Sequence, residues 1–196
     1  MTDGPDADHG EASGGAAPSP VRVFISYAWN DPAHEARVRD FWLFLRQNGI
    51  DAQVDLTAAE RRQDWAEWMT QQVRDADHVL VIASPEYKRR AEGDAGPDEG
   101  RGVQWEARLI RDRFYADQRA GLQVVIPVVL PGGTAADIPL WLGPAATTHY
   151  VVSECTTAGA EKLLRLLTAQ PWEVNPPLGA IPVLPPRSPG AAHTAQ

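Results

Sequence analysis

The residues that could do chemistry in this chain are carboxylates, hydroxyls and aromatic side chains near predicted strand ends. We single out Glu106, a carboxylate that directly follows Trp105 before a predicted helical stripe. A carboxylate in this place could stabilise positive charge that develops on a substrate. Aromatic rings beside it could stack on a cationic ring by cation–π attraction. The other candidates at these strand ends are Ser26, Tyr27, Ala28, Trp29, Asp55 and Ser84.

A second group of candidates lies in the loop expected after the second strand and at the helix starts. Arg61 and Arg62 could face an anionic group, as could backbone amides near residues 28–33. Trp65 could stack on a substrate ring. Plainer interpretations stay open: Glu106 could favour a helix dipole and Asp55 could cap a loop. Hydrogen bonds within turns would explain Tyr27 and Ser84, and packing in the core would explain Trp65. The two arginines could simply lie on a solvent-exposed face.

Several familiar catalytic motifs are absent from the sequence. No GxGxxG or GxxxxGK[ST] run follows the first predicted strand, which argues against a hydride-transferring dinucleotide enzyme and a P-loop NTPase. The five histidines are scattered without ligand spacing, so no metal site is expected. Phosphate-accepting receiver domains need a cluster of acids, but Ser26-Tyr27 and Ser84-Pro85 follow the two relevant strands.

Composition limits the partners and the compartment. The net charge is −8, and no basic stripe is visible, which argues against nucleic acid as a partner. Cys155 is the only cysteine, so an internal disulfide is impossible and a reducing compartment fits. Residues 1–20 lack the pattern of a signal peptide, and no apolar run approaches the ~20 residues needed to span a bilayer. We therefore expect a cytoplasmic protein without a membrane anchor.

The chain divides into three parts by composition. Residues 1–20 contain no large apolar side chain after Met1 and are predicted to be a disordered leader. Residues 21–170 alternate strand-like and helix-like patterns and are predicted to form one domain. Residues 171–196 contain the proline-rich run PPLGAIPVLPPRSPG and are predicted to be a flexible tail.

The elements that must position the candidate residues are five short strands alternating with helices. HVLVIA at 78–83 is continuously apolar, as a central parallel strand covered on both faces would be. Residues 86–102 are expected to form a long loop. This alternation predicts a flavodoxin-like α/β fold, a parallel sheet of order 2-1-3-4-5 flanked by helices. The other predicted strands are residues 21–26, 50–54, 122–130 and 149–152.

Four motifs in order carry a resemblance to a known family. VFISYAWND, at 23–31, resembles the opening strand and turn of TIR-like domains. DWAEWMTQQVRDADHVLVIASPEYKRR and GVQWEARLIRDRFY are more similar to the bacterial SEFIR branch of that superfamily. VVIPVVLPGG and DIPLWL continue the match. The resemblance covers about residues 21–170 and implies the same flavodoxin-like fold.

The resemblance implies two activities. One is homotypic assembly with like domains, and the other is cleavage of NAD to nicotinamide and an ADP-ribose product in bacterial immunity against phage. Enzymatic members use a glutamate on the helix after strand three, usually a few residues beyond a tryptophan; here Glu106 directly follows Trp105, as in the SEFIR pattern. The loop after strand two, 55–63, would complete a neighbouring subunit's site. NAD would be a substrate, so no cofactor is expected. The alternative function is a non-catalytic adaptor that acts by binding like domains.

One carboxylate is enough for this reaction. Ordinary glycosidases need two, one to protonate the leaving oxygen and one to act as nucleophile or base. Nicotinamide departs neutral from a cationic pyridinium and needs no acid. The remaining requirement is to stabilise positive charge on the ribose, a role that the resemblance assigns to Glu106.

Overall fold

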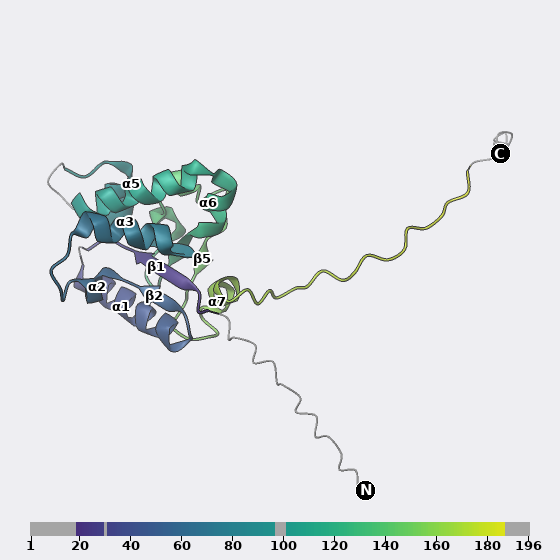
Figure 1. Ribbon diagram of the computed structural model, residues 1–196, viewed down its shortest axis with the longest axis horizontal. Helices are drawn as coiled ribbons and strands as arrows, with labels where there is room; N and C mark the ends of the chain where they lie inside the picture. The colour runs from purple at the N-terminus through teal and green to yellow at the C-terminus, as the bar shows by residue number, and fades with distance from the viewer. Residues whose placement is uncertain (1–18, 30, 97–100, 187–196) are drawn as a thin grey trace, which may run out of the picture.

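The computed structural model describes residues 19–29, 31–96 and 101–186 and contains one five-stranded sheet (Figure 1). All strand pairs are parallel, and the order is β2-β1-β3-β4-β5. The predicted fold class and strand order are confirmed. The strands are β1 (Arg22–Ser26), β2 (Asp51–Gln53), β3 (His78–Ile82), β4 (Val125–Val129) and β5 (Tyr150–Val151).

Helices cover both faces of this sheet. Helices α1 (Pro32–Gln47) and α7 (Glu161–Leu167) lie on one face, and α3 (Trp65–Asp75), α4 (Pro85–Glu92) and α5 (Arg101–Ala116) lie on the other. Successive strand residues point to opposite faces, so Ile25 packs with α1 while Phe24 packs with α3 and α5. Both faces of the central strands are buried, which explains why β3 is apolar at almost every position.

Two long helices begin where the sequence places capping residues. The side chain of Asp31 accepts hydrogen bonds from the amides of Ala33 and His34, and Pro32 occupies the first turn of α1. Asp64 accepts from the amides of Ala66 and Glu67 at the start of α3. These caps place the first turns of both helices at the carboxyl edge of the sheet.

Two segments differ from their predictions. Residues 86–102 were expected to be a long loop, but α4 occupies Pro85–Glu92, because Ser84 caps its start and Gly93 ends it at φ +89°. Residues 122–130 were expected to be one strand, but α6 (Gln118–Val124) extends into that run before β4 begins. Asp117 caps α6 by accepting from the amides of Arg119 and Ala120.

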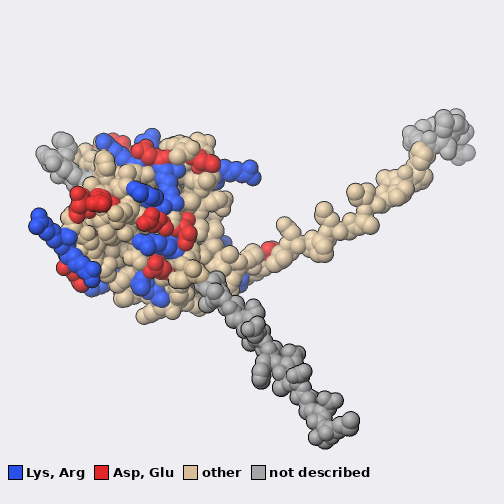
Figure 2. Space-filling model, in the orientation of Figure 1, with Lys and Arg blue, Asp and Glu red and all other residues tan. Residues whose placement is uncertain are grey.

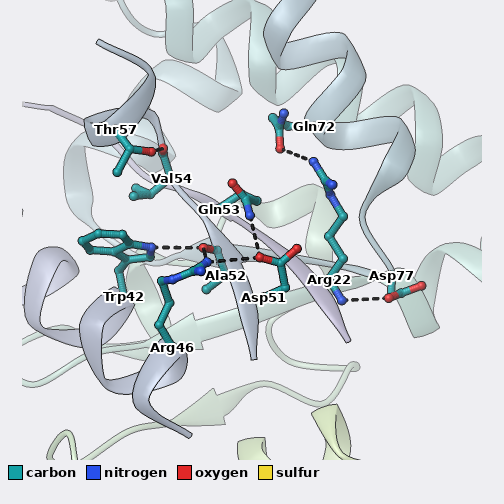
Figure 3. A network of polar contacts seen from close by, with 10 residues as sticks. All are labelled: Arg22, Trp42, Arg46, Asp51, Ala52, Gln53, Val54, Thr57, Gln72 and Asp77. Atoms are coloured by element: carbon teal, nitrogen blue, oxygen red, sulfur yellow. Dashed lines mark hydrogen bonds and ion pairs between the residues drawn. The ribbon is translucent and has the colours of Figure 1, made fainter. Parts of the chain in front are cut away.

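A polar network at the start of β1 and β2 holds the edge strand in place (Figure 3). Trp42 and Arg46 of α1 both donate hydrogen bonds to the carbonyl of Ala52, each at 3.0 Å. Arg22 donates to Gln72 of α3 through its side chain and to Asp77 through its backbone amide. These bonds hold β2 against α1 on one face of the sheet and β1 against α3 on the other.

The remaining elements are short. A single helical turn, α2 (Asp55–Ala58), follows β2, and two 3-10 turns, η1 (Ala135–Asp137) and η2 (Leu140–Leu142), follow β4. Residues 171–186 form no helix or strand and extend away from the domain after α7 (Figure 1). The predicted leader falls almost wholly on residues 1–18, outside the described residues. Within the part that the structure describes, no helix is long and apolar enough to cross a membrane.

Candidate functional site

A cavity of about 250 Å³ opens at the carboxyl edge of the sheet, beside the end of β1. Its walls come from the segments after β1 and β2 and from the first turns of α3 and α5. Four aromatic rings and two carboxylates dominate the lining. The lining residues are Tyr27, Trp29, Asp55, Ala59, Trp65, Trp68, Met69, Gly102, Val103 and Glu106.

Glu106 lies at the inner end of this cavity on the second turn of α5, where only 8% of it is exposed. Its Oε1 atom is buried and has no hydrogen-bond partner among the described residues. Burial raises the pKa of this carboxyl to about 8; the Ser26 hydroxyl acts in the opposite direction, and the charge of Asp55 raises the pKa further. A pKa of about 8 favours the protonated form of Glu106 at neutral pH.

Asp55 is the second carboxylate of the cavity. It begins α2, and its Oδ2 atom accepts a hydrogen bond of 2.6 Å from the indole N–H of Trp29. Its Oδ1 atom is buried without a partner among the described residues. Burial raises the pKa of Asp55, against the opposing effect of the indole hydrogen bond. Hydrogen bonding to the Tyr27 hydroxyl also lowers the pKa of Asp55.

Aromatic rings surround the two acids. Tyr27 is 3% exposed and stacks on Trp29, with ring centroids 6.1 Å apart and planes 22° apart. The Tyr27 hydroxyl is buried, and burial, the charge of Asp55 and hydrogen bonding to Asp55 raise the pKa of Tyr27. Trp65 meets Trp68 edge to face at 5.8 Å and is 42% exposed at the mouth.

The sequence of residues 23–167 matches the family model of the TIR domain. The chain belongs to the TIR domain family. The crystal structure of a prokaryotic SEFIR domain is similar at a TM-score of 0.55 and 22% identity, covering 82% of this chain and 99% of that one. The crystal structure of the SEFIR domain of IL-17 receptor B is similar at a TM-score of 0.52 and 17% identity. That match covers 76% of this chain and 98% of the receptor domain. Among curated proteins, none is significantly similar to the chain in sequence.

The structure brings together five of the residues singled out from the sequence of this TIR domain. They line one cavity although they come from four different segments: Tyr27, Trp29, Asp55, Trp65 and Glu106. Arg61 lines an adjacent cavity of about 330 Å³, and Trp68 borders both. The structure shows that these residues lie close together. Their roles in substrate binding and catalysis stay predictions.

The other candidates do not line the TIR-domain cavity. Ala28 is fully buried in the core, and the Ser84 hydroxyl accepts from the Tyr87 amide as the cap of α4. Trp105 precedes Glu106 by one residue, which turns it about 100° around α5 and leaves it 45% exposed. Arg62 is exposed outside the cavity lining. Of the proposed backbone amides near 28–33, that of residue 30 lies outside the described residues.

One residue beneath the cavity was missed by the sequence argument. Tyr87 of α4 is completely buried, and its hydroxyl shares a hydrogen bond of 2.8 Å with the Ser26 hydroxyl. Burial and the charge of Glu106 raise the pKa of Tyr87. No local pattern marked Tyr87, because its segment was expected to be a loop. Spacing from the Ser84-Pro85 cap would have revealed it as a first-turn helical residue.

A partly buried arginine braces the wall of the cavity. The side chain of Arg90 is 12% exposed, pairs with Glu86 one turn earlier on α4, and donates a 3.0 Å hydrogen bond to the backbone carbonyl of Trp29. Since Trp29 in turn holds Asp55, the brace connects α4 to both carboxyl-edge segments. Arg90 is thus a positioning residue for Trp29.

Replacing Arg90 by methionine is expected to lower the free energy of unfolding by about 1–3 kcal/mol, because the Trp29 carbonyl loses a charged donor. Glu86 keeps its pair with Arg89. Urea unfolding measures the loss. The matched control is Arg74→Met on the exposed side of α3, expected to change stability by less than about 0.5 kcal/mol. Equal effects of the two substitutions would contradict the bracing role.

Proposed function

We propose that this TIR domain hydrolyses NAD to nicotinamide and an ADP-ribose product, with Glu106 as its catalytic carboxylate. The observation that carries the proposal is the cavity itself. It brings the buried carboxyl of Glu106 and the partly exposed carboxyl of Asp55 together beside four aromatic side chains. No lysine or arginine is among its described lining residues. Such a site favours a flat organic cation.

The nicotinamide ring of NAD is a cation of this kind. It could enter at the exposed edge of Trp65 and meet the faces of Trp29 or Tyr27, where cation–π attraction contributes about 0.5–2 kcal/mol. A positive charge close to Glu106 would favour the ionised carboxylate and lower its raised pKa. Substrate binding would therefore convert Glu106 to the form that the reaction needs.

The bond changes then balance without an acid catalyst. The bond between ribose C1′ and the ring nitrogen breaks, and its electron pair stays on nitrogen, so nicotinamide leaves neutral. The ionised Glu106, close to the ribose hydroxyls, stabilises the positive charge that develops on the sugar. Water adds to C1′ and loses a proton, which gives ADP-ribose.

Assembly would complete the site. The segment after β2, 55–63, carries Asp55 into this cavity and Arg61 into the adjacent one, where an arginine could face a pyrophosphate. We infer that self-association through this segment orders it, so that the isolated protomer is slow and the assembly fast. A cytoplasmic role in defence against phage belongs to the same proposal.

The direct test is nicotinamide release from NAD by the purified chain, followed by chromatography with and without a crowding agent. We expect turnover per protomer to rise with protein concentration and with crowding, because self-association completes the site. The crowding agent without protein is the control. Absence of nicotinamide release from fully assembled protein would refute the hydrolase proposal.

A second candidate, a non-catalytic adaptor, is favoured by the tryptophans exposed on this side of the domain. Trp29, Trp65 and Trp105 are 42–45% exposed, and aromatic side chains are enriched at protein interfaces. In that case substitution of Arg61 and Arg62 would abolish assembly, and wild-type protein would leave the cellular NAD pool intact.

A further inference from the structure

The segment after α7 carries an apolar stripe that the folded domain does not use. Residues 174–186 contain no charged side chain, and the extended segment is tan beyond its base in Figure 2. Its aliphatic side chains are the most exposed of the described chain: Leu178 is 100% exposed, Ile181 91%, Val183 96% and Leu184 80%. Val174 is 78% exposed as well, and five exposed aliphatic residues in so short a segment need an explanation.

Proline content sets the backbone conformation of this segment. Residues 176–186 include Pro176, Pro177, Pro182, Pro185 and Pro186, and the structure shows neither helix nor strand there. Each proline fixes its own φ near −65° and pushes the preceding residue toward extended conformations. The segment is thereby biased to a polyproline II helix, which has three residues per turn.

The aliphatic residues repeat with the period of that helix. Leu178, Ile181 and Leu184 are spaced by three, so a polyproline II helix would place them in one row of roughly 19 Å, at about 3.1 Å per residue. Pro182 and Pro185 would form the neighbouring row, and in the sequence Arg187 follows Leu184 by three residues. The order is aliphatic–Pro–x–aliphatic–Pro–x–Arg.

We propose that residues 176–186 form a docking segment for a partner domain with an aromatic-lined, SH3-type groove. Proline–aliphatic pairs of a polyproline II helix fill the clefts between the aromatic rings of such grooves. The single arginine at one end would pair with an acidic residue on the groove's rim and fix the direction of binding. Little backbone entropy remains to be lost on docking, because the prolines already restrict the unbound chain.

Two other roles for the segment make different predictions. A passive spacer needs no row of aliphatic residues, and it would tolerate any change that keeps its length. Docking onto the chain's own domain would cover the row, whereas Leu178, Ile181 and Leu184 are open in the structure. The segment also lies outside the cavity described above, so this proposal is independent of NAD hydrolysis.

The test uses the full chain and, as probe, a purified ¹⁵N-labelled SH3 domain that accepts ligands ending in arginine. We expect resonance shifts confined to the aromatic groove of the probe. The double substitution Pro182→Ala/Pro185→Ala should weaken binding about tenfold or more, because each anchor contributes above 1 kcal/mol. Arg187→Glu should also weaken binding, by reversing the charge at the rim.

The matched control is Pro176→Ala/Pro177→Ala, which removes the same number of prolines outside the central motif and should keep binding within about threefold. None of these changes touches the folded domain, so folding does not limit the test. Absent groove shifts, or equal weakening by both double substitutions, would overturn the proposal. So would resonance shifts in the chain's own ¹⁵N-labelled domain when Pro182 and Pro185 are replaced, since they would show docking in cis.

Discussion

Glu106→Gln is expected to reduce nicotinamide release from NAD by about 10²–10³-fold in kcat, the range found when one buried electrostatic partner of a transition state is removed. Glutamine keeps the size of the side chain and its hydrogen-bonding capacity but cannot carry a negative charge. Binding of NAD should fall much less, because the aromatic wall of Trp29 and Trp65 stays in place. The measurement is single-turnover and steady-state kinetics on the assembled protein.

The matched control for this substitution is Glu67→Gln, on the exposed side of the neighbouring helix α3. It removes the same charge outside the cavity lining and should leave kcat within about twofold of wild type, since surface substitutions change little. Loss of activity through misfolding is excluded if Glu106→Gln unfolds at a temperature no lower than wild type. Equal kcat values for Glu106→Gln and wild type would remove this residue from the mechanism.

The stability of the domain is expected to fall as the pH rises from about 4.5 to about 8, because the pKa of Glu106 is raised from 4.5 to about 8 in the folded state. In the unfolded chain Glu106 ionises first, so the unfolded state binds fewer protons across this range. The contribution of Glu106 to the free energy of unfolding is fully present below about pH 4.5 and is lost by about pH 8. At about 1.4 kcal/mol per pKa unit, the loss is on the order of 5 kcal/mol.

Guanidinium unfolding at several pH values between about 5 and 8 measures this loss, and the linkage relation gives its expected slope. Glu106→Gln should flatten most of the profile and should exceed wild type in stability near the alkaline end. The raised pKa of Asp55 contributes in the same direction, so a smaller slope should persist in the variant. A wild-type profile without slope would contradict the buried, unpaired state of the Glu106 carboxyl.

Both predictions describe one physical conflict. An ionised carboxylate in a cavity without a bound cation destabilises the fold, and the same carboxylate stabilises the transition state once a cationic substrate is present. The Oε1 atom of Glu106 has no hydrogen-bond partner among the described residues, so a cationic ligand beside it would resolve that conflict. A bound cationic ligand should therefore stabilise the domain most strongly at alkaline pH.

The periodicity of apolar residues and the positions of helix-capping residues were enough to predict the fold class and the strand order. HVLVIA is apolar throughout because β3 is covered on both faces, and Asp31-Pro32 and Asp64 begin the helices that cross the sheet. These patterns are local in the sequence, so they can be recognised without knowing how the elements pack. Residues 86–102 were wrongly predicted to be a loop, because α4 is mostly polar and Tyr87 is its one buried residue. The start and the end of α4 depend on the Ser84 cap and on Gly93.

Sequence also determined that Tyr27, Asp55 and Glu106 would meet, since parallel strands end at one edge. Only the tertiary structure decided which neighbours join them. It turned Glu106 inward and Trp105 outward on the same helix, and it paired Trp29 with Asp55, Tyr87 with Ser26 and Arg90 with the Trp29 carbonyl. These contacts join segments far apart in the chain. They depend on how helices pack on the sheet, which no local pattern of residues encodes.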